Sequence, residues 1–129
     1  MSNDITNREI SLNDGTSDNR VSLFYGGASN RIRAEVKKDS VTVFNSFTTS
    51  YDVKNINKIA VKYKSSDYSF YVNGTQIGSS PTSSSFDANT LNTLDFNRGG
   101  GSDKFYGKCK DLRYYDTALT DAELTELTT

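Results

Sequence analysis

Short runs of alternating apolar and polar residues, separated by turn residues, recur along most of this chain. Alternation with a period of two predicts half-buried β-strands. In the clearest run, residues 31–37, Ile32, Ala34 and Val36 should face a core and the charged residues between them water. The Asn73-Gly74 dipeptide separates two runs and favours a type I′ hairpin. The same pattern predicts further strands at 9–12, 20–25, 40–44, 59–63, 68–72, 75–78 and 94–96.

The end of the chain carries two more predictions. Residues 104–115 also alternate, but the apolar phase slips between Cys109 and Leu112, which predicts one long strand with a β-bulge near 110–111. Cys109, the lone cysteine, should be a small core residue. Thr120 and Glu123 match a capping box and predict a short helix. The residues expected to hold that helix on a sheet are Leu119, Leu124 and Leu127.

These elements predict a single all-β domain over residues 1–129, with 1–7 as a polar N-terminal tail. Many short strands with short turns favour a two-sheet antiparallel jelly-roll sandwich, closed by one short C-terminal helix. A barrel is the lesser alternative. Serine, threonine and asparagine make up one third of the chain, which suits outward strand positions and turns.

The composition excludes several classes of protein. The chain has no histidine and one cysteine, so Ser-His-Asp triads, imidazole metal sites and internal disulfides are excluded. A net charge of −1 without a basic stretch argues against nucleic acid as a partner. We therefore read the basic residues within 31–38 as a solvated strand face. The N-terminus is polar and carries no signal-peptide core, and the apolar runs are too short to span a membrane.

The second half of the chain resembles a known family. The ordered segments that support this are 58–64 (KIAVKYK), 70–74 (FYVNG), 105–108 (FYGK), 111–115 (DLRYY) and 118–124 (ALTDAEL). This series is similar to the concanavalin A-like lectin/glucanase superfamily, in its laminin-G/pentraxin-like branch. It looks most like versions found in structural and tail-fibre proteins of tailed phages, including marine ones. The resemblance runs from about residue 5 to 129 and implies a concanavalin A-like jelly roll.

One departure from the family concerns the first strand. Such domains usually open with an apolar strand ahead of the part aligned with residues 9–12, whereas residues 1–7 are polar. A missing strand would leave a sheet edge unpaired. We therefore expect the vacant edge to be filled by a partner chain, by a second copy in a homo-oligomer, or by the N-terminal tail.

Catalysis is tested first, because the superfamily includes glucanases. These enzymes carry their carboxylates on one strand with a spacing of roughly Glu-x-Asp-x-x-Glu, which no predicted strand here contains. The acidic residues Asp121, Glu123 and Glu126 fall in the terminal helix. The sequence therefore predicts a protein that is not an enzyme.

Calcium is the candidate cofactor, because lectins and laminin-G domains often bind it through loop oxygens. Asp14, Asp18 and Asn19 cluster around a turn and are the candidate ligands. Ordinary turn chemistry explains the same residues, since Asp and Asn side chains bond to nearby backbone.

A glycan is the candidate ligand. Sugar sites usually combine a stacking aromatic ring with amide and charged side chains, but the chain has no tryptophan. The alternative is that the tyrosines merely cover the sheets. The candidate glycan-binding residues are Asn73, Asn97, Arg98, Asp103 and Tyr71.

We therefore expect a non-enzymatic carbohydrate-binding or adhesion module of a phage virion or a secreted surface protein. The alternative is a structural virion or assembly module that acts through protein contacts without a small ligand. A glycoside hydrolase is a distant third. The expected location is the virion or the extracellular surface.

Overall fold

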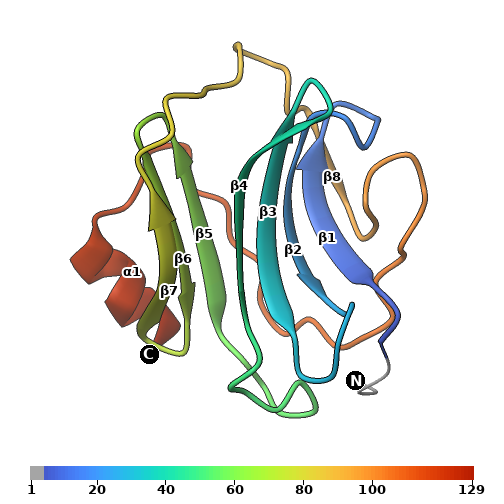
Figure 1. The fold of residues 1–129 in the computed structure, drawn as a ribbon, viewed down its shortest axis with the longest axis vertical. Coiled ribbons are helices and arrows are strands. Elements are labelled where there is room, and N and C mark those ends of the chain that lie inside the picture. Colours follow the sequence, from blue (N-terminus) through green and yellow to red (C-terminus); the bar gives the residue numbers. More distant parts are fainter. Residues whose placement is uncertain (1–4) are drawn as a thin grey trace.

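The computed structural model describes residues 5–129, which form eight β-strands in two antiparallel sheets and one helix. The predicted mostly-β sandwich with a short C-terminal helix is confirmed (Figure 1). The five-stranded sheet has the order β4-β3-β2-β1-β8 and the three-stranded sheet the order β5-β6-β7. The elements are β1 (Arg8–Asn13), β2 (Arg20–Tyr25), β3 (Ile32–Lys38), β4 (Val41–Thr48), β5 (Ile59–Lys64), β6 (Asp67–Val72), β7 (Thr75–Ser80), β8 (Thr93–Asp95) and α1 (Asp121–Thr128).

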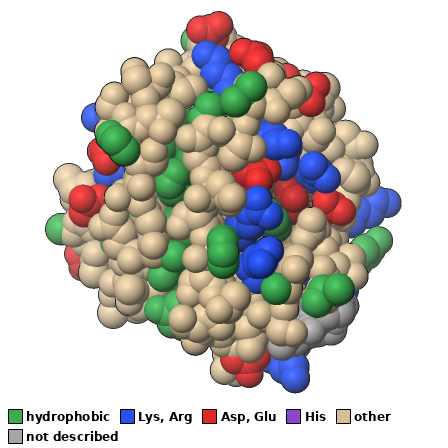
Figure 2. All heavy atoms as spheres, in the orientation of Figure 1, with side chains coloured by type: hydrophobic (Ala, Val, Ile, Leu, Met, Phe, Trp, Pro, Cys, Tyr) green, Lys and Arg blue, Asp and Glu red, His purple; other side chains and the backbone are tan. Residues whose placement is uncertain are grey.

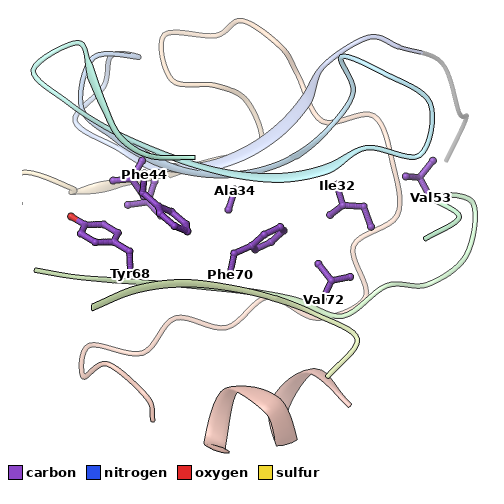
Figure 3. Close-up of a cluster of buried hydrophobic side chains, with 9 residues drawn as sticks. Ile32, Ala34, Phe44, Val53, Tyr68, Phe70 and Val72 are labelled. Atoms are coloured by element: carbon purple, nitrogen blue, oxygen red, sulfur yellow. The ribbon is translucent and has the colours of Figure 1, made fainter. Parts of the chain in front are cut away.

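The core lies between the two sheets. Phe44 of the five-stranded sheet stacks on Tyr68 of β6, with ring centroids 5.6 Å apart. Figure 3 shows the two inner faces meeting, while α1 lies on the far side of the three-stranded sheet. Because the strands alternate, the apolar residues of each strand reach this core from one face. The buried apolar residues of the cluster are Val21, Ile32, Ala34, Val36, Phe44, Val53, Tyr68, Phe70 and Val72.

The three-stranded sheet covers only part of the five-stranded one. Across the core, β5 lies against β2 and β7 against β4, and within residues 5–129 neither β1 nor β8 makes comparable contact with a strand of the three-stranded sheet. Leu94 of β8 pairs with Leu12, which pairs with the core residue Val21, so all three share the inner face. Leu94 is nevertheless 51% exposed. An apolar strip of the inner face therefore remains uncovered on the side of β1 and β8.

The β6–β7 hairpin and the terminal helix form as predicted. Asn73 and Gly74 both have positive φ (49° and 81°), as a type I′ turn requires. Thr120 and Glu123 form both hydrogen bonds of the capping box, and α1 packs on the outer face of β5, β6 and β7. Of the three leucines expected to hold the helix, Leu124 is buried and the other two are half-buried.

The strand predicted over residues 104–115 does not form. Lys104 makes an isolated parallel bridge to Glu9, and the residues that follow run without strand structure to α1. The residues after Lys104 find no partner strand in the described part of the chain. Part of β1 is already paired with β8, and β5 makes ladder hydrogen bonds with β6 alone. Without a neighbouring strand, alternation by itself cannot hold this segment extended. Cys109 is exposed, so its predicted core position is wrong.

Two further expectations concern the N-terminal tail and membranes. Of the predicted tail, residues 1–4 lie outside the described part, and Gly27 N–H donates to the carbonyl oxygen of Ile5 (2.9 Å). Within residues 5–129, α1 is short and polar, and no helix has the length and apolar character needed to cross a membrane.

Candidate functional site

The outer face of the five-stranded sheet carries polar and charged side chains in register across four strands. One cross-strand row consists of Glu9, Phe24, Arg33 and Phe47. The next consists of Ser11, Ser22, Glu35 and Asn45, and a third contains Asn13, Arg20, Lys37 and Thr42. Because side chains directly opposite each other in an antiparallel pair interact, this register brings acidic and basic groups together.

These charges form a chain of ion pairs in which arginine and glutamate alternate. Arg33 Nη2 lies 2.7 Å from Glu35 Oε2, and the other oxygen of Glu35 bonds to Arg20 Nη2. Arg20 Nε lies 3.7 Å from Glu9 Oε2 and donates to Ser22 Oγ. Arg20 is 2% exposed and Glu9 is 1% exposed. Burial of charge is tolerated here because each ion has an oppositely charged neighbour.

The loop of residues 97–103 covers one side of this face and explains the burial. Ser11 Oγ donates to the carbonyl oxygen of Asn97 (2.7 Å), and Glu9 N–H donates to that of Asp103 (3.0 Å). A Cβ on Gly99 would lie 2.3 Å from the carbonyl oxygen of Thr16, and this residue has φ +91°, so only glycine fits this close approach. The loop therefore forms a wall along one side of the outer face of the five-stranded sheet.

A cavity of about 210 Å³ lies between this wall and the sheet. Its surface is charged, with four cationic and two carboxylate side chains. Figure 2 shows basic and acidic side chains gathered over β1 to β3. The lining residues are Asn7, Glu9, Arg20, Phe24, Arg33, Glu35, Lys37, Thr42 and Arg98.

Two buried polar atoms at the cavity have no hydrogen-bond partner within residues 5–129. They are Oε2 of Glu9 and Nε of Arg98. Burial raises the pKa of Glu9 above its ordinary value, although the neighbouring Arg20 opposes this shift. Burial likewise lowers the pKa of Arg20, and Glu9 and Glu35 oppose that shift. Buried polar groups normally have hydrogen-bond partners, so a buried polar atom without one at a cavity marks a place where a ligand can form a hydrogen bond.

Aromatic rings lie beside the charged cavity. Phe47 is 51% exposed and stands opposite Arg33, while the Arg31 guanidinium lies 4.7 Å from the centre of its ring. Phe24 is buried beneath Arg33, whose guanidinium lies 4.9 Å from the ring centre. An accessible ring next to convergent polar groups is an arrangement suited to a small polar ligand with an apolar face.

The structure separates the five predicted glycan-binding residues into two groups. Asn97, Arg98 and Asp103 lie together in the covering loop, where Arg98 Nη1 is 3.3 Å from Asp103 Oδ2. Asn73 lies on the other sheet and bonds to Lys58 N–H and Asn57. Tyr71 is buried on that sheet and its hydroxyl donates to Gln76 Oε1 (3.2 Å). Of the five, Arg98 lines the cavity.

The predicted calcium ligands bond to one another and to backbone. Asp14 accepts hydrogen bonds from Thr16 at Oδ1 and from Asn19 at Oδ2, and these bonds hold its pKa below the ordinary value. Asn19 Oδ1 accepts from Asp39 N–H, and the carbonyl oxygen of Asp18 accepts from Ser40 N–H. No group of three His, Cys, Asp or Glu side chains that could hold a metal occurs within residues 5–129. Calcium binding therefore stays a prediction.

The sequence interpretation missed most of the cavity. It assigned Glu35 to a solvated face, but Glu35 is 6% exposed and bonded to two arginines. The available signal was the charge pattern at the outward positions of three successive strands. Reading it requires the strand register, which aligns Glu9, Arg20 and Glu35 only once the sheet has formed.

Comparison with solved structures supports the fold. The CBM40 module of the Ruminococcus gnavus IT-sialidase matches with a TM-score of 0.75 at 19% identity, over all of this chain and 77% of that one. The same module bound to α2,3-sialyllactose matches with a TM-score of 0.77 at 18% identity and the same coverage. At these identities the likeness concerns the fold alone.

Comparison by sequence identifies the family. A search of curated proteins finds no match. The model of a family described as the concanavalin A-like lectin/glucanases superfamily matches residues 2–125, nearly the whole chain. This agrees with the two antiparallel sheets and the covering helix. The chain therefore belongs to the concanavalin A-like lectin/glucanase superfamily.

Proposed function

We propose that this protein is a carbohydrate-binding module that holds a glycan on the outer face of its five-stranded sheet. The observation that carries the proposal is the charged cavity, with unused bonding capacity at Glu9 and Arg98 and the exposed ring of Phe47 beside it. Sugars present hydroxyl groups for such polar contacts and apolar ring faces for an aromatic side chain.

The structural neighbours support this proposal. A carbohydrate-binding module with this fold has been seen with sialyllactose bound. The proposal is for binding without catalysis, because Glu35 is bonded to two arginines and Arg20 lies beside Glu9. Glycoside hydrolysis needs two carboxylates free to act at the scissile bond, and both oxygens of Glu35 are bonded to guanidinium groups. Release of reducing sugar from any glycan would contradict this part.

A glycan array followed by titration calorimetry tests the proposal. Phe47→Ala should weaken binding of an array hit about fivefold, since a stacking ring contributes on the order of 1 kcal/mol. Tyr115→Ala is the matched control, because it removes another exposed aromatic ring from a segment that does not line the cavity. Equal affinity of both variants would place the glycan elsewhere. An array without hits would overturn the proposal.

A second candidate function is a structural module that acts through protein contacts. The observation in its favour is the uncovered inner face at β1 and β8, next to the free edge of β5. An extended strand of another polypeptide added to β5 would lie under β1 and cover Leu12 and Leu94. Light scattering that shows a strict monomer at high concentration would count against a second copy as that strand.

The setting of the protein is part of the proposal. A glycan-binding module acts where glycans are displayed, so we place it on a virion or at an extracellular surface. Co-purification with phage particles would support the virion setting. Recovery of the protein only in the soluble fraction of lysed host cells, away from particles, would contradict it.

A further inference from the structure

Three groups at the cavity keep unused hydrogen-bonding or ion-pairing capacity within residues 5–129. Lys37 lines the cavity and makes no ion pair or hydrogen bond there. Nε of Arg98 and Oε2 of Glu9 are buried without hydrogen-bond partners. The cavity therefore offers two cationic donors and one anionic acceptor to whatever enters it.

The remaining charges at the cavity are already used. Arg33, Glu35 and Arg20 form a continuous chain of ion pairs that ends at Glu9. Arg98 bonds to Asp103 through Nη1, and its Nε has no hydrogen-bond partner within residues 5–129. Once these pairs are counted, Lys37 is the cation without a carboxylate. An anionic group on the ligand would supply the missing counter-charge.

The arrangement also gives the ligand an orientation. Lys37 comes from β3 and Arg98 from the covering loop, and Glu9 lies on β1 at the buried floor. A carboxylate would be repelled by Glu9 and attracted by the two cations. A hydroxyl or amide N–H, by contrast, could donate to Glu9 Oε2. Hydrogen bonds to charged groups are roughly twice as strong as neutral ones, so both contacts discriminate.

From this geometry we infer that the ligand is an acidic sugar, bound with its carboxylate at Lys37 and Arg98 and with an N–H or O–H donor at Glu9. This inference rests on the proposed glycan-binding function and narrows its ligand class. A neutral sugar would leave Lys37 without a counter-charge, and a simple anion would leave Glu9 without a donor. Lys37, Arg98 and Glu9 are thus the residues that determine specificity.

Calorimetric titration with two matched probes tests the inference. α2,3-Sialyllactose carries a carboxylate and an amide N–H, and lactose is its neutral core. We expect sialyllactose to bind at least tenfold more tightly than lactose, with an affinity that falls as salt is raised. A digalacturonic acid probe, whose donors are hydroxyl groups, should also bind more tightly than lactose.

Variants of two neighbouring lysines identify the site. Lys37→Gln should weaken sialyllactose binding about tenfold, which corresponds to about 1.4 kcal/mol. Lys38→Gln is the matched control, because it removes the same charge one residue along β3, where the side chain points to the opposite face. Glu9→Gln should lower the affinity for sialyllactose more than the affinity for acetate. The melting temperature of this variant shows whether its fold survives.

The outcomes separate the inference from the proposed function. If lactose binds as tightly as sialyllactose, or if Lys37→Gln and Lys38→Gln behave alike, the acidic-sugar inference fails while glycan binding stands. If acetate alone matches the affinity of sialyllactose, the role of Glu9 is overturned. If no glycan binds, both the inference and the proposed function are wrong.

Discussion

The outer faces of the two sheets both bury charge, but they do so differently. On the three-stranded sheet, Lys62 lies beneath α1 and bonds to Asp67 (3.0 Å) and Asp121 (3.1 Å), both of which reach solvent. Burial lowers the pKa of Lys62, but these two carboxylates outweigh burial and raise it. On the five-stranded sheet, Arg20 lies between two carboxylates that are themselves buried, beside a cavity.

This difference indicates which of the two outer faces can bind a ligand. At Lys62 each carboxylate partner is half or more exposed, so solvent has access to its remaining oxygen lone pairs, and α1 covers the face. At Arg20 both carboxylate partners are buried, and Oε2 of Glu9 has no hydrogen-bond partner within residues 5–129. Buried ions with unused capacity add little to stability but are available to a ligand. The first face is built for stability, and the second is suited to recognition.

Replacing the central cation on each face gives the largest expected contrast. Arg20→Met would leave Glu9 and Glu35 as buried carboxylates with one fewer guanidinium, and should lower the free energy of unfolding by about 3–5 kcal/mol. Lys62→Met should cost about 1 kcal/mol or less, because water can solvate the two aspartates. Urea denaturation of both variants measures the contrast. Similar costs would mean that the two faces do not differ as described.

Removing the helix cap gives a smaller effect that is confined to one face. Thr120→Ala deletes the side chain that accepts from Glu123 N–H and should destabilise the protein by about 1 kcal/mol. Glycan affinity should stay unchanged, because α1 covers the sheet opposite the cavity. Thermal melting and calorimetry on the same samples provide the two readouts. A loss of affinity would show that the two faces are coupled.

The pH dependence of stability gives the smallest effect. Glu9 has a pKa raised above 4.5, so the folded protein holds more protons than the unfolded chain as the pH passes upward from about 4.5. Its contribution is therefore present below that pH and is lost as the pH rises through the raised pKa. In Glu9→Gln the fall in the free energy of unfolding with rising pH that Glu9 causes should vanish. The control variant Glu126→Gln, at an exposed position, should retain it. Urea midpoints between pH 4 and 8 measure the slopes, and an unchanged slope in Glu9→Gln would contradict the assignment.

Cavity residues in a recognisable loop could be predicted from the sequence, whereas cavity residues that strand pairing brings together could not. Arg98, which lines the cavity, was among the predicted glycan-binding residues because it falls in a loop that is visible in the sequence. Glu9 and Arg20 were not, because they lie far apart in sequence from Arg98 and meet it only through the pairing of β1 with β2 and β8. The predicted strand at 104–115 failed for the same reason, since a strand needs a partner as well as a pattern.

The sequence by itself determined seven of the strand positions closely, the Asn73-Gly74 hairpin and the capped helix. Each of these depends on residues within a few positions of one another, through alternation, positive φ or a capping bond. Only the tertiary structure decided which polar side chains became buried. The covering loop packs on the β1–β2 turn at Gly99 and encloses Glu9 and Arg20. Burial depends on what distant segments cover, and no local pattern encodes that.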